Sequence, residues 1–228
     1  MNDIKGKKLI VFGDSIMYGS GNGGFGVGEY LEKELGLSLK KYCVGGARTG
    51  YYEGKNWIVE QVRMSVINKD TADYIVLDGF TNDCYKTDGE NYDVPLGEVK
   101  QGFDGFDIFK VKKEGTTFSD CLENIFSAFK KYFPNAKVVF VRPHNMGRRG
   151  EEIQRIYGER AVEICKKWGV EVADIYSDTE LNTFLPEHRD KYTYDSYDWG
   201  RGDCTHPNAL GYETFYIPII SKILRSEK

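Results

Sequence analysis

Short apolar runs alternate with longer amphipathic segments along most of this chain. Five of the runs predict buried strands, at residues 9–12, 39–44, 74–77, 138–141 and 170–173. Apolar residues at helical spacing predict helices, around residues 27–35, 57–68, 118–132, 151–167 and 209–225. Alternating strands and helices are typical of a parallel sheet whose right-handed crossovers cover both faces. The pattern therefore predicts an α/β fold.

The predicted elements fit one domain over residues 1–228. A chain of 228 residues with 40% hydrophobic composition can bury a core of ordinary size. Pro218 interrupts the last helical pattern, and a proline inside a helix costs about 3 kcal/mol or begins a new segment. We therefore expect that helix to break or kink near Tyr216.

Residues 84–117 interrupt the regular alternation. They show no clear period and contain seven acidic residues and five glycines. A loop of this length in a compact domain is usually functional or mobile. Because it follows the strand at residues 74–77, we expect a flap across a pocket at that strand end, with Phe103, Phe106 and Phe109 as its apolar underside. The alternative is a passive surface insertion.

Charge and cysteine content narrow the class of protein. A net charge of -4 and a pI near 5.6 argue against a broad nucleic-acid surface. The basic N-terminal flank leads into an apolar run of only four residues, too short for a secretion signal or a membrane span. Five cysteines without a CxxC pair fit reduced thiols. We expect a cytoplasmic protein without a nucleic-acid or membrane partner.

Candidate catalytic groups follow several of the predicted strands. Ser15 comes after the first, the glycine pair ending at Gly46 after the second, and Asn82 after the third. Ligands bind at this edge of open α/β sheets. Near the C-terminus, Asp203 and His206 are three residues apart, so the carboxylate can orient the imidazole. A serine, an oriented base and neutral donors are the parts that an acyl-transfer site requires.

In these segments the chain resembles the SGNH hydrolases, also called the GDSL esterase/lipase family, whose four blocks occur in order over residues 9–212. The resemblance implies a three-layer α/β/α, flavodoxin-like sandwich with a five-stranded parallel sheet. It implies that Ser15 is the nucleophile, that His206 is the base oriented by Asp203, and that no cofactor is needed. The oxyanion hole would consist of the Ser15 N–H, the Gly46 N–H and Asn82.

The chain departs from the family pattern at one position. The family usually has glycine two residues before the asparagine of its third block, and here that position is Phe80, with Gly79 one place earlier. The departure affects either the backbone beside Asn82 or the shape of the acyl pocket. Phe80 is therefore a candidate substrate contact.

Two further patterns suggest cofactors and are rejected. Residues 21–26 match GxGxxG, but they begin nine residues after the first strand, whereas a dinucleotide fingerprint follows its strand directly. Cys43, Cys84 and Cys204 lie beside the motif residues and could bind zinc with His206. Cysteine is commonly a small buried residue, so packing is the favoured interpretation. We expect neither a metal nor a nucleotide.

Other residues near the motifs are candidate substrate contacts. His144 follows the fourth strand and faces the same edge of the sheet, where it would be a pocket contact or a structural residue. Tyr194 and Trp199 precede Asp203 among other aromatic and acidic residues. Aromatic faces with nearby carboxylates suit sugars, although the same rings could instead cover the core.

The sequence favours a serine esterase that removes acetyl or another short acyl group from a carbohydrate or a similar polar ester. One alternative is a lysophospholipase or thioesterase, which would share the catalytic residues but have a long apolar groove. A second is a carbohydrate-binding module without catalysis on the same fold. The sequence does not define the oligomeric state.

Overall fold

The computed structural model describes residues 4–85, 93–196 and 200–226. Its centre is a parallel five-stranded sheet in the order β2-β1-β3-β4-β5. The strands are β1 (Lys8–Phe12), β2 (Ser38–Lys41), β3 (Tyr74–Leu77), β4 (Lys137–Arg142) and β5 (Glu171–Asp174). The predicted α/β class and the five parallel strands are confirmed, and the strand order is the flavodoxin-like one.

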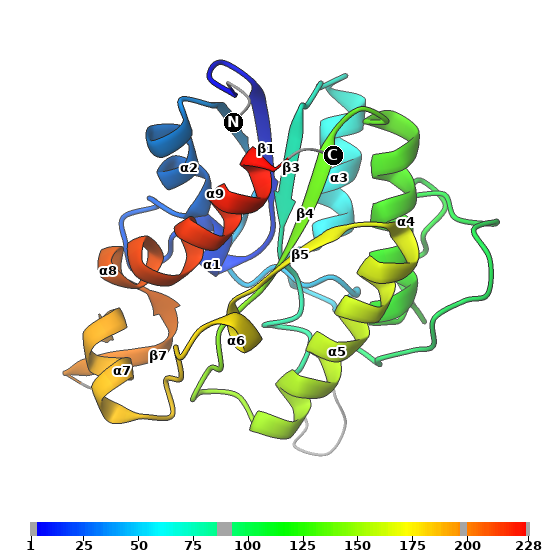
Figure 1. Ribbon diagram of the computed structural model, residues 1–228. Helices are drawn as coiled ribbons and strands as arrows, with labels where there is room; N and C mark the ends of the chain where they lie inside the picture. The colour runs from blue at the N-terminus through cyan, green and yellow to red at the C-terminus, as the bar shows by residue number, and fades with distance from the viewer. Residues whose placement is uncertain (1–3, 86–92, 197–199, 227–228) are drawn as a thin grey trace.

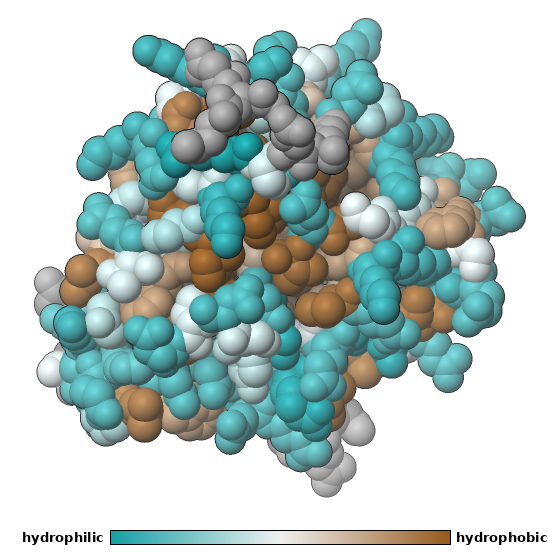
Figure 2. Space-filling view, in the orientation of Figure 1, coloured by the Kyte–Doolittle hydropathy of each residue, from teal (hydrophilic) through white to brown (hydrophobic). Residues whose placement is uncertain are grey.

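Helices cover both faces of the sheet, which makes three layers (Figure 1). One face carries α2 (Val27–Leu35) and α9 (Ile217–Arg225), and the other carries α3 (Ile58–Ile67), α4 (Phe118–Tyr132) and α5 (Glu151–Trp168). Hydrophobic residues gather near the centre of the face in Figure 2, where β5 and α9 lie. Val172, Ile219 and Ile223 there are only partly buried. Within the described residues, no helix is long and apolar enough to cross a membrane.

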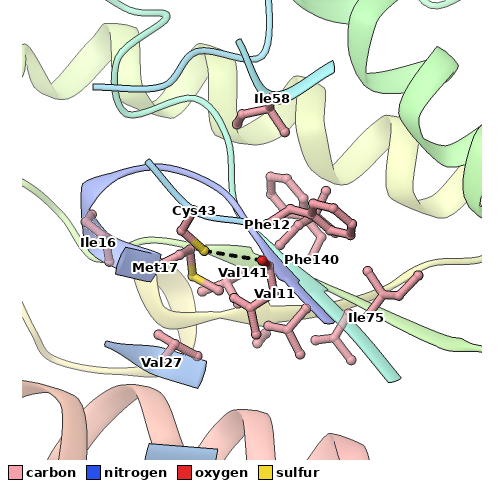
Figure 3. Packing of buried hydrophobic residues seen from close by; sticks show 14 of the residues in the cluster. Val11, Phe12, Ile16, Met17, Val27, Cys43, Ile58, Ile75, Phe140 and Val141 are labelled. Atoms are coloured by element: carbon pink, nitrogen blue, oxygen red, sulfur yellow. Dashed lines mark hydrogen bonds between the residues drawn. The ribbon is translucent and has the colours of Figure 1, made fainter. Parts of the chain in front are cut away.

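The core is built on β1, the strand that leads into Ser15. Its residues 9–12 are buried, and Phe12 stacks on Phe129 of α4 with ring centroids 5.5 Å apart. Cys43 packs beside this strand and donates from Sγ to the Val11 carbonyl at 3.4 Å (Figure 3). Burying each large apolar side chain contributes about 1.5–3 kcal/mol, so β1 is a firm support for the residues that follow it.

The C-terminal helical region is irregular just before the proline. It consists of α8 (Ala209–Gly211), a π-helical turn over Tyr212–Tyr216, and then α9. The Ile217 N–H donates to the Tyr212 carbonyl, five residues back. Pro218 lies in the first turn of α9, where a missing N–H costs least. The helical backbone is therefore continuous through Tyr216, so no break occurs there, and the irregularity in this helix is the π-helical turn.

Several short elements were not predicted. They are α1 (Ser15–Tyr18), α6 (Ile175–Asp178), α7 (Pro186–Tyr192) and the antiparallel pair β6 (Thr193–Ser196) and β7 (Arg201–Pro207). None has a long hydrophobic period, because each is short and much of it is polar. Their form depends on contacts with distant parts of the chain.

The prediction of a flap is wrong for the part of the segment around Phe103 and Phe106, whereas the end of the segment lies beside Tyr51, whose N–H donates to Thr116 Oγ1 at 3.4 Å. Phe103 and Phe106 pack edge-on against Trp168, with ring centroids 5.1 and 5.4 Å apart. Helix α5 follows β4 and precedes β5, so its last residue, Trp168, lies at the amino edge of the sheet, opposite Ser15. The aromatic residues of this segment therefore cover α4 and α5. Residues 86–92, which also belong to the predicted flap, lie outside the described residues.

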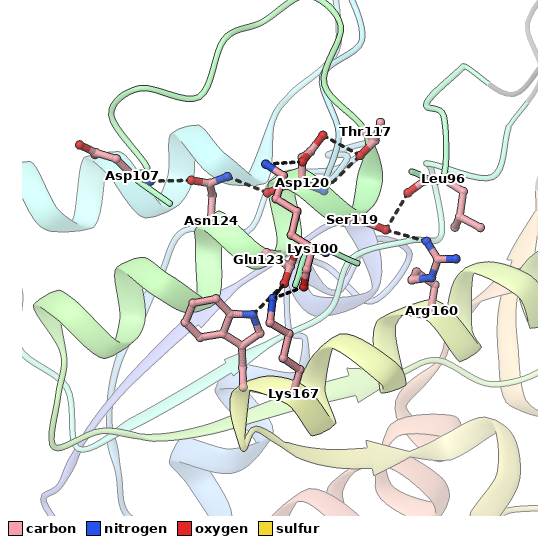
Figure 4. Close-up of polar contacts among 11 residues, drawn as sticks. Leu96, Lys100, Asp107, Thr117, Ser119, Asp120, Glu123, Asn124, Arg160 and Lys167 are labelled. Atoms are coloured by element: carbon pink, nitrogen blue, oxygen red, sulfur yellow. Dashed lines mark hydrogen bonds and ion pairs between the residues drawn. The ribbon is translucent and has the colours of Figure 1, made fainter. Parts of the chain in front are cut away.

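Polar contacts hold this segment to α4 and α5 (Figure 4). Glu123 of α4 is buried and forms an ion pair with Lys167 of α5. The same carboxylate accepts from the Lys100 N–H at 3.1 Å and from Trp168 Nε1 at 3.3 Å, and Lys167 also donates to the Lys100 carbonyl at 2.9 Å. The contacts satisfy a buried charge and fix the segment away from the site.

The Trp168→Ala variant should lose about 3–5 kcal/mol of stability, because it removes a buried aromatic side chain and the surface under Phe103 and Phe106. Urea unfolding measures this loss. Ile67→Ala, at a side chain 58% exposed on α3, is the matched control and should change stability by less than about 0.5 kcal/mol. Altered ester hydrolysis by folded Trp168→Ala, without a loss of stability, would show that the segment acts on the site.

Candidate active site

The candidate residues meet at the carboxyl edge of the sheet. Ser15 begins α1 just after β1, and Asp14 caps that helix by accepting the Ile16 N–H at 2.8 Å. Asn82 follows β3. The hairpin of β6 and β7 brings Asp203 and His206 to the same place, since β7 contacts α1. Three segments that are distant in the sequence therefore form one site.

Three side chains form a hydrogen-bonded row. Ser15 Oγ lies 2.8 Å from Nε2 of His206, and Nδ1 of His206 lies 2.5 Å from Oδ2 of Asp203. Ser15 and Asp203 are buried, and the His206 side chain is partly exposed. A carboxylate at Nδ1 favours the tautomer that keeps its proton there, which leaves Nε2 free to accept from the serine. The row has the geometry of a nucleophile, its base and an orienting acid.

A tight turn builds the Asp203–His206 pair. Cys204 has a φ of 66°, an uncommon conformation for a residue with a side chain. The turn lets Oδ1 of Asp203 accept the N–H groups of Thr205 at 2.9 Å and His206 at 2.8 Å. Burial raises the pKa of Asp203, but the bonds from His206 and the backbone outweigh burial and leave the pKa below its ordinary value. Asp203 is therefore ionised at neutral pH.

The predicted oxyanion donors differ in whether their N–H groups already donate a hydrogen bond. The Ser15 N–H is in the first turn of α1, where no helical carbonyl can accept it. Gly46 is exposed with a φ of 73°, and its N–H has no partner among the described residues. Asn82 donates from Nδ2 to Asp14 Oδ2 at 3.1 Å and to the Ala47 carbonyl at 3.0 Å. An oxyanion would share or replace one of these bonds.

Two of the predicted substrate contacts do not fit the structure. Phe80 is 1% exposed and His144 is fully buried, so neither side chain reaches a substrate. His144 Nδ1 lies 2.7 Å from the Tyr216 hydroxyl, and burial lowers the pKa of His144 to about 3. These residues follow strand ends, but their side chains turn into the core. The pocket-contact prediction is wrong for both, and His144 is a structural residue.

The other two predicted contacts have different outcomes. Tyr194 is partly exposed on β6, and its ring lies against Gly21, where an added Cβ would be 2.5 Å from the ring carbon Cγ. It therefore borders the loop that follows α1 and remains a predicted contact. Trp199 lies outside the described residues.

Two supporting residues were not predicted. Gln61 of α3 is buried and makes a two-bond clamp with Gly13, accepting its N–H and donating to its carbonyl, each at 2.9 Å. Asp78 is buried beside the same glycine, and an added Cβ at Gly13 would be 2.1 Å from Asp78 Oδ1. In the sequence, these two residues could have been noticed only as polar residues in or next to apolar elements: Gln61 lies within the predicted helix at 57–68, and Asp78 directly follows the predicted strand at 74–77.

The cysteines are buried or partly buried free thiols. Burial raises the pKa of Cys84 to about 12, which disfavours the thiolate that a metal would bind. The part of the chain that the structure describes holds no group of three or more metal-ligating side chains. Cys43 and Cys84 are thus packing residues, as the favoured interpretation has it.

Fold and site together define a class. A three-layer α/β/α sandwich with a five-stranded parallel sheet is the fold of the SGNH hydrolases. The chain matches the GDSL-like lipase/acylhydrolase family over residues 11–214, and it belongs to that family. Members of this family are generally ester hydrolases. No curated protein matches the chain.

Solved structures share the fold at low sequence identity. A protein from Lactobacillus plantarum is 20% identical with a TM-score of 0.69, and the match covers 97% of this chain and 95% of that one. A lipase/acylhydrolase from Enterococcus faecalis is 16% identical with a TM-score of 0.56, covering 97% of both chains. An acetylxylan esterase from Geobacillus stearothermophilus is 15% identical with a TM-score of 0.58, covering 98% and 96%.

Gly13→Ala should lower ester hydrolysis on the order of 10²-fold, because its Cβ would collide with Asp78 and displace the start of α1. Gly169→Ala is the control: Gly169 also has a positive φ, but nothing lies within 4 Å of its Cβ position, at the far end of α5. The control should lose only about 1–2 kcal/mol of stability and keep full activity. Steady-state kinetics and urea unfolding of both variants test this, and equal activities would contradict it.

Proposed function

We propose that this protein is a serine esterase that removes acetyl or another short acyl group from a carbohydrate or similar polar ester. The observation that carries the proposal is the row from Ser15 Oγ through His206 to Asp203. A non-catalytic module would have no use for a buried carboxylate that orients a histidine against a serine hydroxyl.

The row supports a two-step acyl transfer. Ser15 Oγ attacks the ester carbonyl while His206 Nε2 takes its proton, and Asp203 stabilises the imidazolium. The N–H groups of Ser15 and Gly46, with the Asn82 amide, stabilise the oxyanion. His206 then returns the proton to the departing alcohol, which leaves acyl-Ser15. Water, deprotonated by His206, releases the acid and restores the serine. No cofactor enters either step.

An open groove beside the Gly46 loop supports a polar substrate. It has a volume of about 400 Å³ and lies between this loop and α3. Asn56 at its rim donates to the Gly45 carbonyl at 3.1 Å. Its lining combines aromatic, aliphatic and polar side chains, of which the aromatic and polar ones suit stacking and hydroxyl bonding. It consists of Tyr42, Val44, Tyr51, Lys55, Asn56, Trp57, Glu60, Gln61, Met64 and Lys113. The acetylxylan esterase with the same fold supports a small acyl group.

The proposal includes a cytoplasmic location and a small-molecule or carbohydrate ester as substrate, with neither a nucleic acid nor a membrane as partner. All five cysteines are free thiols, which supports a reducing compartment.

Ser15→Ala should lower turnover of 4-nitrophenyl acetate by on the order of 10⁴-fold or more, since the hydroxyl carries the covalent step. A fluorophosphonate should label the wild-type protein once, at Ser15, as mass spectrometry of peptides would show. Ser20→Ala, five residues along in the same region, should still be labelled. A folded Ser15→Ala variant with a tenth of wild-type activity would reject the nucleophile.

Tyr51→Ala should lower kcat/KM for acetylated xylo-oligosaccharides by about tenfold, because the loss of an aromatic contact costs about 0.5–1.5 kcal/mol beyond the area it buries. Hydrolysis of 4-nitrophenyl acetate, which is too small to fill the groove, is the control and should not change. Equal losses on both substrates would remove the groove from the proposal. Faster hydrolysis of 4-nitrophenyl decanoate than of the acetate by the wild-type enzyme would favour the lipid alternative.

A further inference from the structure

Two carboxyl groups lie buried side by side beneath Ser15. Asp14 has no exposed surface and Asp78 is 1% exposed. Asp78 Oδ1 accepts the Asp14 N–H at 3.1 Å. Asp78 Oδ2 is buried and has no N–H or O–H donor among the described residues. A buried carboxylate oxygen without a donor is costly, so its protonation state needs an explanation.

The contacts of Asp14 show which carboxyl carries the charge. Its Oδ1 accepts the Ile16 N–H at 2.8 Å, and its Oδ2 accepts Asn82 Nδ2 at 3.1 Å. Both oxygens of Asp14 therefore act as acceptors, as in an ionised group. In Asp78, Oδ1 accepts the Asp14 N–H, whereas Oδ2 accepts no hydrogen bond from the described residues and is able to carry a proton.

The two carboxyl groups also contact each other directly, side chain to side chain. Two buried carboxylates in contact cannot both be ionised, because they repel in a medium of low dielectric constant. Burial raises the pKa of Asp78 well above its ordinary value, and the charge of Asp14 raises it further. Burial also raises the pKa of Asp14, but the Ile16 N–H, His206 and Asp78 oppose this effect. One proton thus stays on the pair, on Asp78.

We propose that Asp78 is a positioning residue for the oxyanion donor: its protonated carboxyl donates to Asp14, and Asp14 in turn holds the amide of Asn82 and the start of α1. The role rests on the proposed esterase function, since it acts through a donor to the oxyanion. Asp78 itself touches neither Ser15 nor a substrate.

Loss of the shared proton should displace Asp14 and with it the groups that Asp14 holds, which are Asn82 and the start of α1. Once Asp78 ionises, two negative charges are in contact, and Asp14 can keep its place only at a high energetic cost. Activity should therefore fall at alkaline pH as this proton leaves. Other titratable groups face the pair: His206 and Asp83 face Asp14, Cys43 and the hydroxyls of Tyr212 and Tyr216 face both carboxyls, and Tyr30 faces Tyr212.

The titration of these neighbouring groups can be distinguished from the titration of Asp78. Burial raises the pKa of Asp83 to about 7, so Asp83 also titrates near neutral pH. Burial raises the pKa values of Cys43, Tyr212 and Tyr216 above their already alkaline ordinary values. An effect that disappears when only Asp78 is changed cannot come from any of these groups.

The test compares Asp78→Asn with Asp78→Leu, using kcat and KM for 4-nitrophenyl acetate across pH. The asparagine can accept the Asp14 N–H and donate to its carboxylate, but it cannot ionise. We expect Asp78→Asn to keep kcat within about threefold at pH 7 and to lose the alkaline decline. Leucine cannot donate, so Asp78→Leu should lower kcat by about 10²-fold with little change in KM, as for a lost oxyanion donor.

A double variant tests the route through Asn82. Asn82→Ala alone should lower kcat by about 10²-fold to 10³-fold. Adding Asp78→Leu to it should lower kcat by less than about threefold more, because residues that act through one another are not additive. A merely structural Asp78 would give additive losses and would leave the alkaline limb in Asp78→Asn.

Labelling of Ser15 by a fluorophosphonate separates this proposal from the esterase function itself. If the wild-type protein is neither labelled nor active, the proposed function fails. If it is labelled and active, the role of Asp78 is overturned by full kcat in Asp78→Leu, by an alkaline limb that persists in Asp78→Asn, or by equal losses in both variants. Should Asp78→Leu not fold, the pH profile of Asp78→Asn decides alone.

Discussion

The hydrogen bond between Ser15 and His206 is the interaction that the rest of the structure serves. It joins residues 191 positions apart, so neither local sequence nor helix propensity can form it. β1 is an interior strand of the sheet and fixes the serine at the carboxyl edge, and the β6–β7 hairpin fixes the histidine against it. An error of about 1 Å at either end would cost much of the activity, which explains why both are built on paired strands.

Beneath this bond lies a layer of buried polar groups that a core would normally avoid. Gln61 clamps the backbone of Gly13, Asp14 caps α1 and holds Asn82, and His144 remains neutral against Tyr216. Each burial is unfavourable unless it is paired. The bonds named here pair these groups, whereas Asp78 Oδ2 and His144 Nε2 have no hydrogen-bond partner among the described residues. The layer holds the site in place before a substrate arrives, which is how electrostatic stabilisation acts without reorganisation.

The two edges of the sheet differ in function: one carries the candidate site, and the other is covered by a packed loop segment. The candidate site occupies the carboxyl edge, where the chain leaves each strand with irregular backbone. At the amino edge, the segment around Phe103 and Phe106 is held to α4 and α5 by Trp168 and Glu123. A long loop need not serve the strand end that it leaves. Its aromatic residues cover apolar surface on the helices, which stabilises the molecule wherever that surface lies.

The sequence by itself determined the five strands and main helices, because periodic apolar residues have to face a core. It also singled out Ser15, Asp203 and His206, through their positions near predicted strand ends, the three-residue spacing of the last two, and the resemblance to the SGNH hydrolases. It did not determine that Phe80 and His144 point inward, that Phe103 and Phe106 pack on Trp168 away from the site, or that Asp78 meets Asp14. In each case a side chain or segment could have faced either the site or the core. Only the packing of distant elements decides these outcomes, because either face is compatible with the local chain.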